Sequence, residues 1–402
     1  MKKTRLIFIF CIFVLCVTIL SSCSLFKPKP PKDTGDFVCT FDKDTLSATI
    51  VNYKGKGDEV VIPDTFGEYK VTHIGNMAFQ EEYDVTSIKL PKYLVKIGNQ
   101  AFAYCVGLES INLPDSLEEI GYGAFNSCRG LTEITIPERV MALNGAFDGC
   151  SSIERFAVSK NNKRYTADKY GVLFEKETLV KYPSGSENGE YVIPDGIKTV
   201  GEYAFSGTQN LEKVIFSDSV ETIGDSAFSA SSITEVDFNN NLKKIGDSAF
   251  SSSSLQTVDL PESLTTIGRQ AFYFCPLTEV HIPSSVTKIE DMAFLECAYI
   301  EKFTVSEDND YFWADEYGVL YDLLDLICYP VGNKQTEYVI PQDTEIIKKY
   351  AFQNCQYLEK VTIPKSVTEI EDCAFAFCPN LNEVVYENPE KLPIISKSAF
   401  YK

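Results

Sequence analysis

Histidine and tryptophan are scarce in this chain, which has two histidines and one tryptophan among 402 residues. Nucleophilic catalysis of the Ser-His-Asp or Cys-His type needs a histidine beside the nucleophile. His73 and His281 occupy ordinary positions of apolar, strand-like segments, and we interpret both as surface residues. Glycine patterns of the P-loop or dinucleotide-binding type are absent as well. The sequence therefore favours a function other than catalysis and indicates no cofactor.

Basic residues are also in deficit. The chain carries 37 Lys and Arg against 57 Asp and Glu, a net charge of −20. A surface with this excess of carboxylates repels the phosphate backbone of nucleic acids. We therefore expect no nucleic-acid partner.

The N-terminus lacks an apolar run long enough to span a bilayer, because its core, residues 6–20 "LIFIFCIFVLCVTIL", has the length of a signal peptide. The next residues, Leu20-Ser21-Ser22-Cys23, resemble the lipobox of bacterial lipoproteins. This resemblance implies removal of residues 1–22 and membrane attachment through diacylglycerol on Cys23. A plain secretory signal with an incidental cysteine is the alternative. Residues 23–35, rich in Pro and Lys, are typical of a tether. We expect an exported lipoprotein on the bacterial surface.

What the sequence has in abundance is one repeated phrase. Ala-Phe recurs in register in twelve units, at 78, 101, 124, 146, 204, 227, 249, 271, 293, 351, 374 and 399, mostly in steps of 22 or 23 residues. A fixed period of this size predicts a solenoid. One unit reads Leu108-x-x-Ile111-x-Leu113-Pro114, then Leu117-x-x-Ile120-Gly121-x-x-Ala124-Phe125-x-x-Cys128. Alternation in its first part predicts a strand, and its second part predicts turns with short helical or 3-10 segments. The glycine, present in seven of twelve units, suggests a left-handed backbone position that cannot be obligatory.

A unit of this length cannot bury its own side chains, so the core must form between stacked coils. Phe102, Phe125 and Phe147 are expected to form one aromatic spine, extended by Phe205, Phe228, Phe250, Phe272 and Phe294. Cysteine follows phenylalanine by three residues in seven of the eleven units that reach this position. Ser or Thr replaces it in three others, which favours a small buried slot over the alternatives of a disulfide or a metal ligand. No CxxC pair is present, and we predict no metal site.

The pattern "LxxIxIPxSLxxIGxxAFxxC" closely resembles the Treponema-type repeat of BspA-like bacterial surface proteins, from about residue 71 to the end. The resemblance implies a curved leucine-rich repeat solenoid spanning residues 71–402, in which residues 36–70 form capping strands at the entry. It also implies an adhesin that recognises host or neighbouring-cell proteins, including extracellular matrix, through a concave sheet. A structural envelope protein without a specific ligand is the alternative, and an enzyme is the third.

Two steps of 58 residues interrupt the period. Residues 156–205 align without gaps on 303–352, and each copy has extended segments bounded by polar turns. We predict two β-hairpin insertions, near 159–190 and 306–337. The second contains Tyr311, Phe312 and Trp313, which are candidate contact residues if exposed, or else pack against the solenoid.

Outward positions of the strands can be read from the alternation. On three successive units between the insertions these positions hold Glu235, Asp237, Asp259, Glu279 and His281. We predict this acidic strip as a binding face for a basic protein segment, and a solvated face that binds nothing is the alternative.

Overall fold

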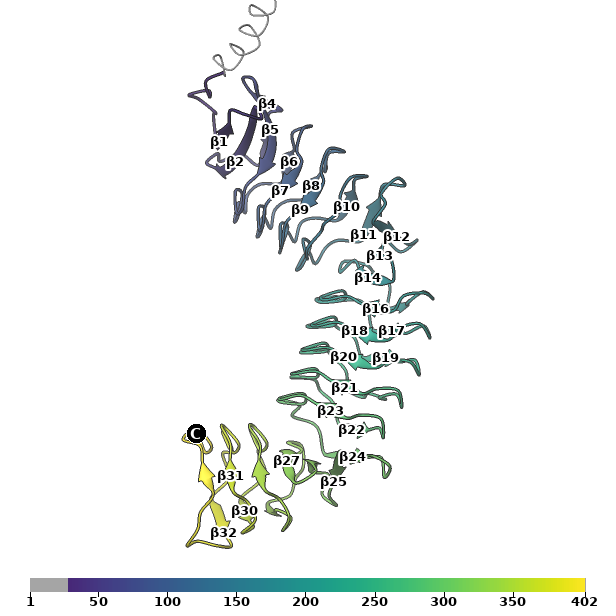
Figure 1. Ribbon diagram of the computed structural model, residues 1–402, viewed down its shortest axis with the longest axis vertical. Helices are drawn as coiled ribbons and strands as arrows, with labels where there is room; N and C mark the ends of the chain where they lie inside the picture. Colours follow the sequence, from purple (N-terminus) through teal and green to yellow (C-terminus); the bar gives the residue numbers. More distant parts are fainter. Residues whose placement is uncertain (1–27, 402) are drawn as a thin grey trace, which may run out of the picture.

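The computed structural model describes residues 28–401, which form 33 short strands and, in that range, no helix. The strands follow one another along a single curved stack of coils (Figure 1). At its N-terminal end β1 (Phe37–Asp42) and β2 (Ser47–Tyr53) form an antiparallel pair, and β2 continues into the stack by parallel pairing with β5 (Tyr69–Ile74). The short β4 (Thr65–Phe66) pairs with β5. The predicted curved leucine-rich repeat solenoid is confirmed.

Most coils contribute one strand to each of two parallel ladders. The first ladder contains the segments that precede Ala-Phe. Its strands are β5, β7 (Lys96–Ile97), β9 (Glu119–Ile120), β14 (Thr178–Lys181), β16 (Thr199–Val200), β18 (Thr222–Ile223), β20 (Lys244–Ile245), β21 (Thr266–Ile267), β23 (Lys288–Ile289), β27 (Asp325–Cys328), β29 (Ile346–Ile347), β31 (Glu369–Ile370) and β33 (Ile394–Ile395).

The second ladder contains the Leu-x-x-Ile-x-Leu segments. Its strands are β3 (Glu59–Val61), β6 (Ser87–Lys89), β8 (Ser110–Ile111), β10 (Glu133–Ile136), β11 (Arg155–Val158), β15 (Glu190–Val192), β17 (Lys213–Ile215), β19 (Glu235–Asp237), β22 (Glu279–Ile282), β24 (Lys302–Val305), β28 (Glu337–Val339), β30 (Lys360–Ile363) and β32 (Glu383–Tyr386).

The stack bends toward the first ladder. In Figure 1 the labels β7, β9, β18, β20, β23 and β31 lie on the inside of the bend, and β6, β8, β19, β22, β24 and β32 lie on the outside. The first ladder contributes three, six and four of its strands to three sheets, whereas the second is divided into sheets of three, two, three, two and three. A solenoid curves toward the side on which its coils are closest. The expectation that the Leu-x-x-Ile-x-Leu strands form a concave sheet is therefore wrong, since they form the convex face.

The Ala-Phe segments are successive turns, so the predicted helical or 3-10 segments are wrong. The reason is that two positions per coil have left-handed backbone, as at Gln100 (φ 53°) and Tyr104 (φ 63°), which interrupts any helical run. Their N–H groups point instead to the next coil. Gln100, Phe102 and Tyr104 donate to the carbonyls of Tyr122 (2.9 Å), Ala124 (2.8 Å) and Asn126 (2.7 Å).

The repeated glycine has a different role from the one suggested by the sequence. Gly98 and Gly121 are not among the residues with positive φ. A Cβ on Gly98 would lie 2.6 Å from the backbone nitrogen of Asn76, and one on Gly121 would lie 2.7 Å from that of Asn99. Glycine is therefore needed because the backbone of the preceding coil approaches closely.

The aromatic spine is confirmed within each block of coils, but it is not continuous from Phe147 to Phe205. Adjacent rings are nearly parallel, with centroids 5.2 Å apart for Phe102 and Phe125, 4.9 Å for Phe228 and Phe250, and 5.4 Å for Phe250 and Phe272. Aromatic pairs add to the stabilisation that burial alone provides. The column therefore joins the coils along the interior of the stack.

The repeated cysteines pack in this interior, as predicted. Six are buried, namely Cys105, Cys128, Cys150, Cys275, Cys297 and Cys355, and Cys378 is partly buried. Most of the thiols donate to a phenylalanine carbonyl of the preceding coil, as Cys128 Sγ does to Phe102 O at 3.1 Å. Ser231 has the same slot and donates to Phe228 O at 2.7 Å. Burial raises the pKa of Cys150 to about 12 and that of Cys275 to about 11.

Both predicted hairpins are present, and each continues into a third strand. β12 (Tyr165–Ala167) pairs antiparallel with β13 (Leu173–Glu175), and β13 with β14, which then joins the first ladder. The second insertion repeats this with β25 (Phe312–Ala314), β26 (Leu320–Asp322) and β27. At each insertion the spine is interrupted, and the buried residues form three core clusters.

Replacement of Phe250 by alanine should destabilise the stack strongly, because the ring is fully buried between Phe228 and Phe272. We expect Phe250→Ala to lower the free energy of unfolding by about 3–5 kcal/mol, measured by urea titration followed by circular dichroism. The control is Phe274→Ala in the next coil, two residues after Phe272, and the side chain of Phe274 is 60% exposed. The control should cost about 0.5 kcal/mol or less. Equal losses for the two variants would contradict the spine as the source of stability.

Alkaline pH should destabilise the protein through its buried thiols. A thiol with pKa about 8.5 when unfolded loses its proton before the folded Cys275 does, whose pKa is about 11. The stabilisation linked to this group is therefore complete below the unfolded pKa and is lost as pH rises through the folded pKa. Urea midpoints should fall as pH rises above about 9. Cys275→Ser should reduce this slope, and an unchanged slope would show that other groups account for it.

Candidate functional site

The predicted acidic strip lies on the convex face, at the centre of the stack. Glu235 and Asp237 are at the ends of β19, Asp259 is in the following coil, and Glu279 and His281 are in β22. All five side chains are exposed. The buried Val236 and Val280 alternate with them and fix their outward direction.

Neighbouring coils neutralise the two ends of this strip. Glu235 forms an ion pair with Lys213 of β17, and Glu279 forms one with Lys302 of β24, at 3.1 Å. His281 Nδ1 shares a hydrogen bond with Thr304 Oγ1 at 3.0 Å. Asp237 and Asp259 have no ion-pair partner between residues 28 and 401. The unbalanced negative charge is therefore concentrated on two carboxylates rather than four.

These two carboxylates border a hollow where the second ladder is interrupted. β19 ends one sheet and β22 begins the next, and residues 256–260 between them form no strand. An open hollow of about 430 Å³ lies there, lined by Glu235, Val236, Asp237, Phe238, Thr257 and Asp259. The sequence pattern did not reveal this gap, because Val258 keeps the alternation of the repeat. The available signal was Asn239, a buried residue that stands where other units have proline and donates to Val220 O at 3.0 Å.

The second insertion separates its three candidate contact residues. Phe312 is 5% exposed and belongs to the core, so it is not a surface contact. Tyr311 is exposed. Trp313 is 38% exposed, and one face of its ring stacks on Tyr321 at 4.2 Å. The packing alternative thus holds for Phe312 and for one face of Trp313.

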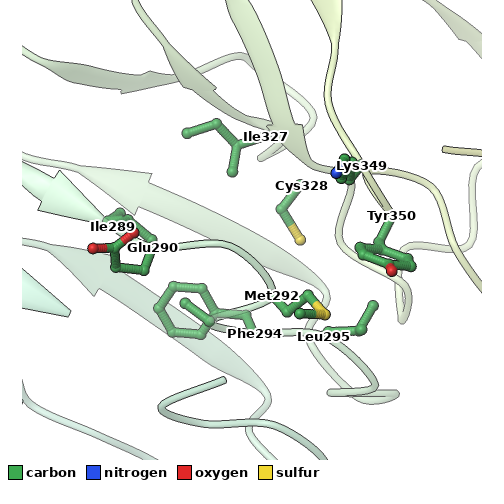
Figure 2. A pocket seen from close by; sticks show the side chains of 10 residues that line it. Ile289, Glu290, Met292, Phe294, Leu295, Ile327, Cys328, Lys349 and Tyr350 are labelled. Carbon is green, nitrogen blue, oxygen red and sulfur yellow. The ribbon is translucent and has the colours of Figure 1, made fainter. Parts of the chain in front are cut away.

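Two further pockets mark the junctions between blocks of the stack. At the first, Lys181 is buried and donates to Asp148 (2.9 Å) and to Tyr203 O (2.7 Å). At the second, the residues aligned with Lys181 and Asp148 are Cys328 and Leu295, and Figure 2 shows both lining a small cavity with Met292. Both pockets are lined by a mixture of apolar and charged side chains.

The two histidines are not brought together into a site in the described part of the chain. His73 lies in β5 of the first ladder, where burial lowers its pKa, far along the sequence from His281. Residues 28–401 contain no group of three or more side chains suited to hold a metal ion. Over the same range, no helix has the length and apolar character needed to cross a membrane. Cys23, the predicted lipid attachment site, lies outside the described residues.

Solved bacterial structures resemble this stack. A leucine-rich repeat protein from Eubacterium ventriosum is 23% identical over 89% of this chain and 96% of its own, with a TM-score of 0.57. A leucine rich cell surface protein from Faecalibacterium prausnitzii is 24% identical, covering 94% of this chain and 86% of its own, with a TM-score of 0.37. The pneumococcal vaccine antigen PcpA is 18% identical, covering 89% and 98%, with a TM-score of 0.47. A search of curated proteins gave no significant match.

The repeats themselves match a family model. The model for the BspA type leucine rich repeat region matches in six copies, over residues 68–170, 184–301 and 329–402. These ranges cover most of the chain and include both ladders in all three blocks. The protein therefore belongs to the family of BspA-type leucine-rich repeat proteins.

Proposed function

We propose that this protein is a lipid-anchored adhesin of the bacterial surface, which binds a basic segment of a host or neighbouring-cell protein. Leucine-rich repeat solenoids are typically protein-binding scaffolds, because their stacked strands present long, exposed surfaces. The observation that carries the proposal is the hollow beside β19, bordered by the unpaired carboxylates of Asp237 and Asp259. The site is on the convex second ladder.

The charge distribution supports a basic ligand. Lysines elsewhere on the second ladder are engaged by glutamates of adjacent coils, so few cations are free to neutralise the two aspartates. A lysine or arginine of a partner would supply the missing countercharge, and complementary charge accelerates association and sets orientation. Glu235 and Glu279 flank this position and add negative potential at its edges even while paired.

Charge reversal at the hollow should abolish binding. The purified chain, residues 24–402, is screened against extracellular-matrix and cell-surface glycoproteins, and the affinity for any retained protein is measured by biolayer interferometry. Asp237→Lys with Asp259→Lys should weaken it by about tenfold or more, since two attractive charges become repulsive.

The matched control is Glu307→Lys with Asp308→Lys, two exposed acids of the second insertion's polar turn. It changes the net charge equally and should leave affinity within about twofold. Equal losses in both variants would show that net charge, and not the hollow, controls binding. A screen without any ligand, together with an envelope defect on deletion, would favour the structural alternative.

Lipid attachment at Cys23 can be tested separately. Wild-type protein made in a bacterium should partition into the detergent phase of a Triton X-114 extract, because the acyl chains anchor it. Cys23→Ser should partition into the aqueous phase. Unchanged partitioning would exclude the lipobox interpretation, and cleavage of residues 36–402 by protease added to intact cells would show outward orientation.

A further inference from the structure

The two insertions provide an internal comparison of surface residues. They align without gaps and share the three-stranded arrangement that ends in the first ladder. At four aligned positions the second copy has Tyr311, Trp313, Leu323 and Leu324, where the first has Arg164, Thr166, Lys176 and Glu177. Charged and polar residues therefore satisfy the same fold at these positions, which means that the apolar residues are not required for folding.

In the first copy these positions make ordinary surface ion pairs. Arg164 pairs with Glu175 at 3.0 Å, and Glu177 pairs with Lys198 at 3.0 Å. Such exposed pairs contribute little to stability and keep the surface soluble. The second copy has apolar or aromatic residues at the same positions in place of these charged ones.

Tyr311, Trp313, Leu323 and Leu324, here named the hairpin patch, lie together around the turn between β26 and β27. Trp313 Nε1 donates to Leu323 O at 2.7 Å, and Leu323 N donates to Tyr311 O at 3.1 Å. All four side chains are exposed, Leu323 by 60%. Contiguous exposed apolar groups of this kind mark interaction surfaces, and Trp and Tyr are enriched among residues that dominate binding energy.

The rim of the hairpin patch is acidic. Asp310 precedes Tyr311, Asp322 precedes Leu323, and Glu345 N donates to Leu324 O at 2.8 Å. None of these three carboxylates has an ion-pair partner among residues 28–401, whereas the neighbouring Asp325 pairs with Lys348 at 2.9 Å. Burial, and after it Asp325, raise the pKa of Asp322, whereas Lys348 lowers it. A partner that fits must therefore combine apolar side chains with cations.

We propose that the hairpin patch is a second docking surface, which binds a protein segment presenting apolar side chains between lysines or arginines. Apolar anchors would cover Trp313 and the two leucines, and the cations would lie against Asp310, Asp322 and Glu345. The proposal does not depend on the acidic strip around Asp237, which lies on other strands. An anionic membrane does not fit this rim, because carboxylates repel anionic headgroups.

Trp313 makes the test direct, because it is the only tryptophan of the chain and its fluorescence reports on the hairpin patch alone. The chain is titrated with a synthetic peptide that alternates Leu or Phe with Lys. The emission should shift to shorter wavelength and saturate as the indole loses water. Two control peptides, with Glu in place of Lys or Ser in place of Leu and Phe, should bind at least about tenfold more weakly.

Variants taken from the first copy test the surface without disturbing the fold. Tyr311→Arg, Leu323→Lys and Leu324→Glu together keep Trp313 and introduce the residues of the aligned positions. This triple variant should retain the parent's thermal midpoint and lose about tenfold or more in affinity. The reciprocal graft transfers both the apolar residues and the acidic rim to the first copy, where the positions aligned with Asp310 and Glu345 are lysines. It consists of Arg164→Tyr, Thr166→Trp, Lys176→Leu, Glu177→Leu, Lys163→Asp and Lys198→Glu, and it should add a second peptide site by calorimetric stoichiometry.

Four outcomes would overturn the proposal. These are unaltered binding to the triple variant, equal binding of the Glu peptide, absence of any fluorescence shift, and a fluorescence shift with anionic vesicles as large as with the Lys peptide. Concentration-dependent dimers that the triple variant abolishes would assign the hairpin patch to a second copy of this chain instead. Loss of ligand binding in the Asp237 and Asp259 variant would leave peptide binding at the hairpin patch unchanged, so the two sites are tested independently.

Discussion

Contact between successive coils is the interaction on which the whole structure depends. No coil buries its own apolar side chains, and each Ala-Phe turn directs its N–H groups to the next coil, as from Phe102 to Ala124. The stacked rings follow the same path, so backbone bonding and aromatic packing enforce one spacing on the inner side of the bend. The strands of the convex ladder also pair in parallel, but in sheets of only two or three strands. The core and the regular spacing of the coils thus both follow from the contacts between successive Ala-Phe turns.

The insertions show how such a stack accommodates a change of period. Each meander takes over one place in the first ladder, yet the ring column stops there and a new core cluster begins. Different polar links join the blocks. Lys181 connects to Asp148 across the first junction, whereas Glu296 accepts hydrogen bonds from Gln353 (2.8 Å) and Asn354 (2.6 Å) across the second. The two copies of the insertion therefore share one strand arrangement but join the blocks through different side-chain contacts.

Repetition made the solenoid, the Phe column and the buried thiols predictable, because like residues at a fixed period must stack. Properties that depend on the neighbouring backbone were not predictable from one coil. The sequence suggested a left-handed backbone at Gly98, but that conformation occurs at Gln100. The residue type at position 100 gives no indication of it. The direction of the bend was missed because both ladders alternate in the same way. The acidic strip was placed correctly on exposed positions, but the gap beside it was hidden by Val258, which fits the pattern without joining a strand.

The distribution of charge gives the two proposed surfaces different roles. Several lysines in or next to the ladder strands pair with a glutamate one coil away, as Lys96 does with Glu119 and Lys243 with Glu221. The excess of carboxylates in this chain of net charge −20 therefore leaves some carboxylates of the described residues 28–401 in places without an ion pair. Asp237 and the rim of the hairpin patch are two such places, but only the hairpin patch adds exposed aromatic and aliphatic side chains. Charge alone mainly raises association rates, whereas buried apolar anchors slow dissociation. The acidic strip is thus suited to capture a basic partner, and the hairpin patch to retain it.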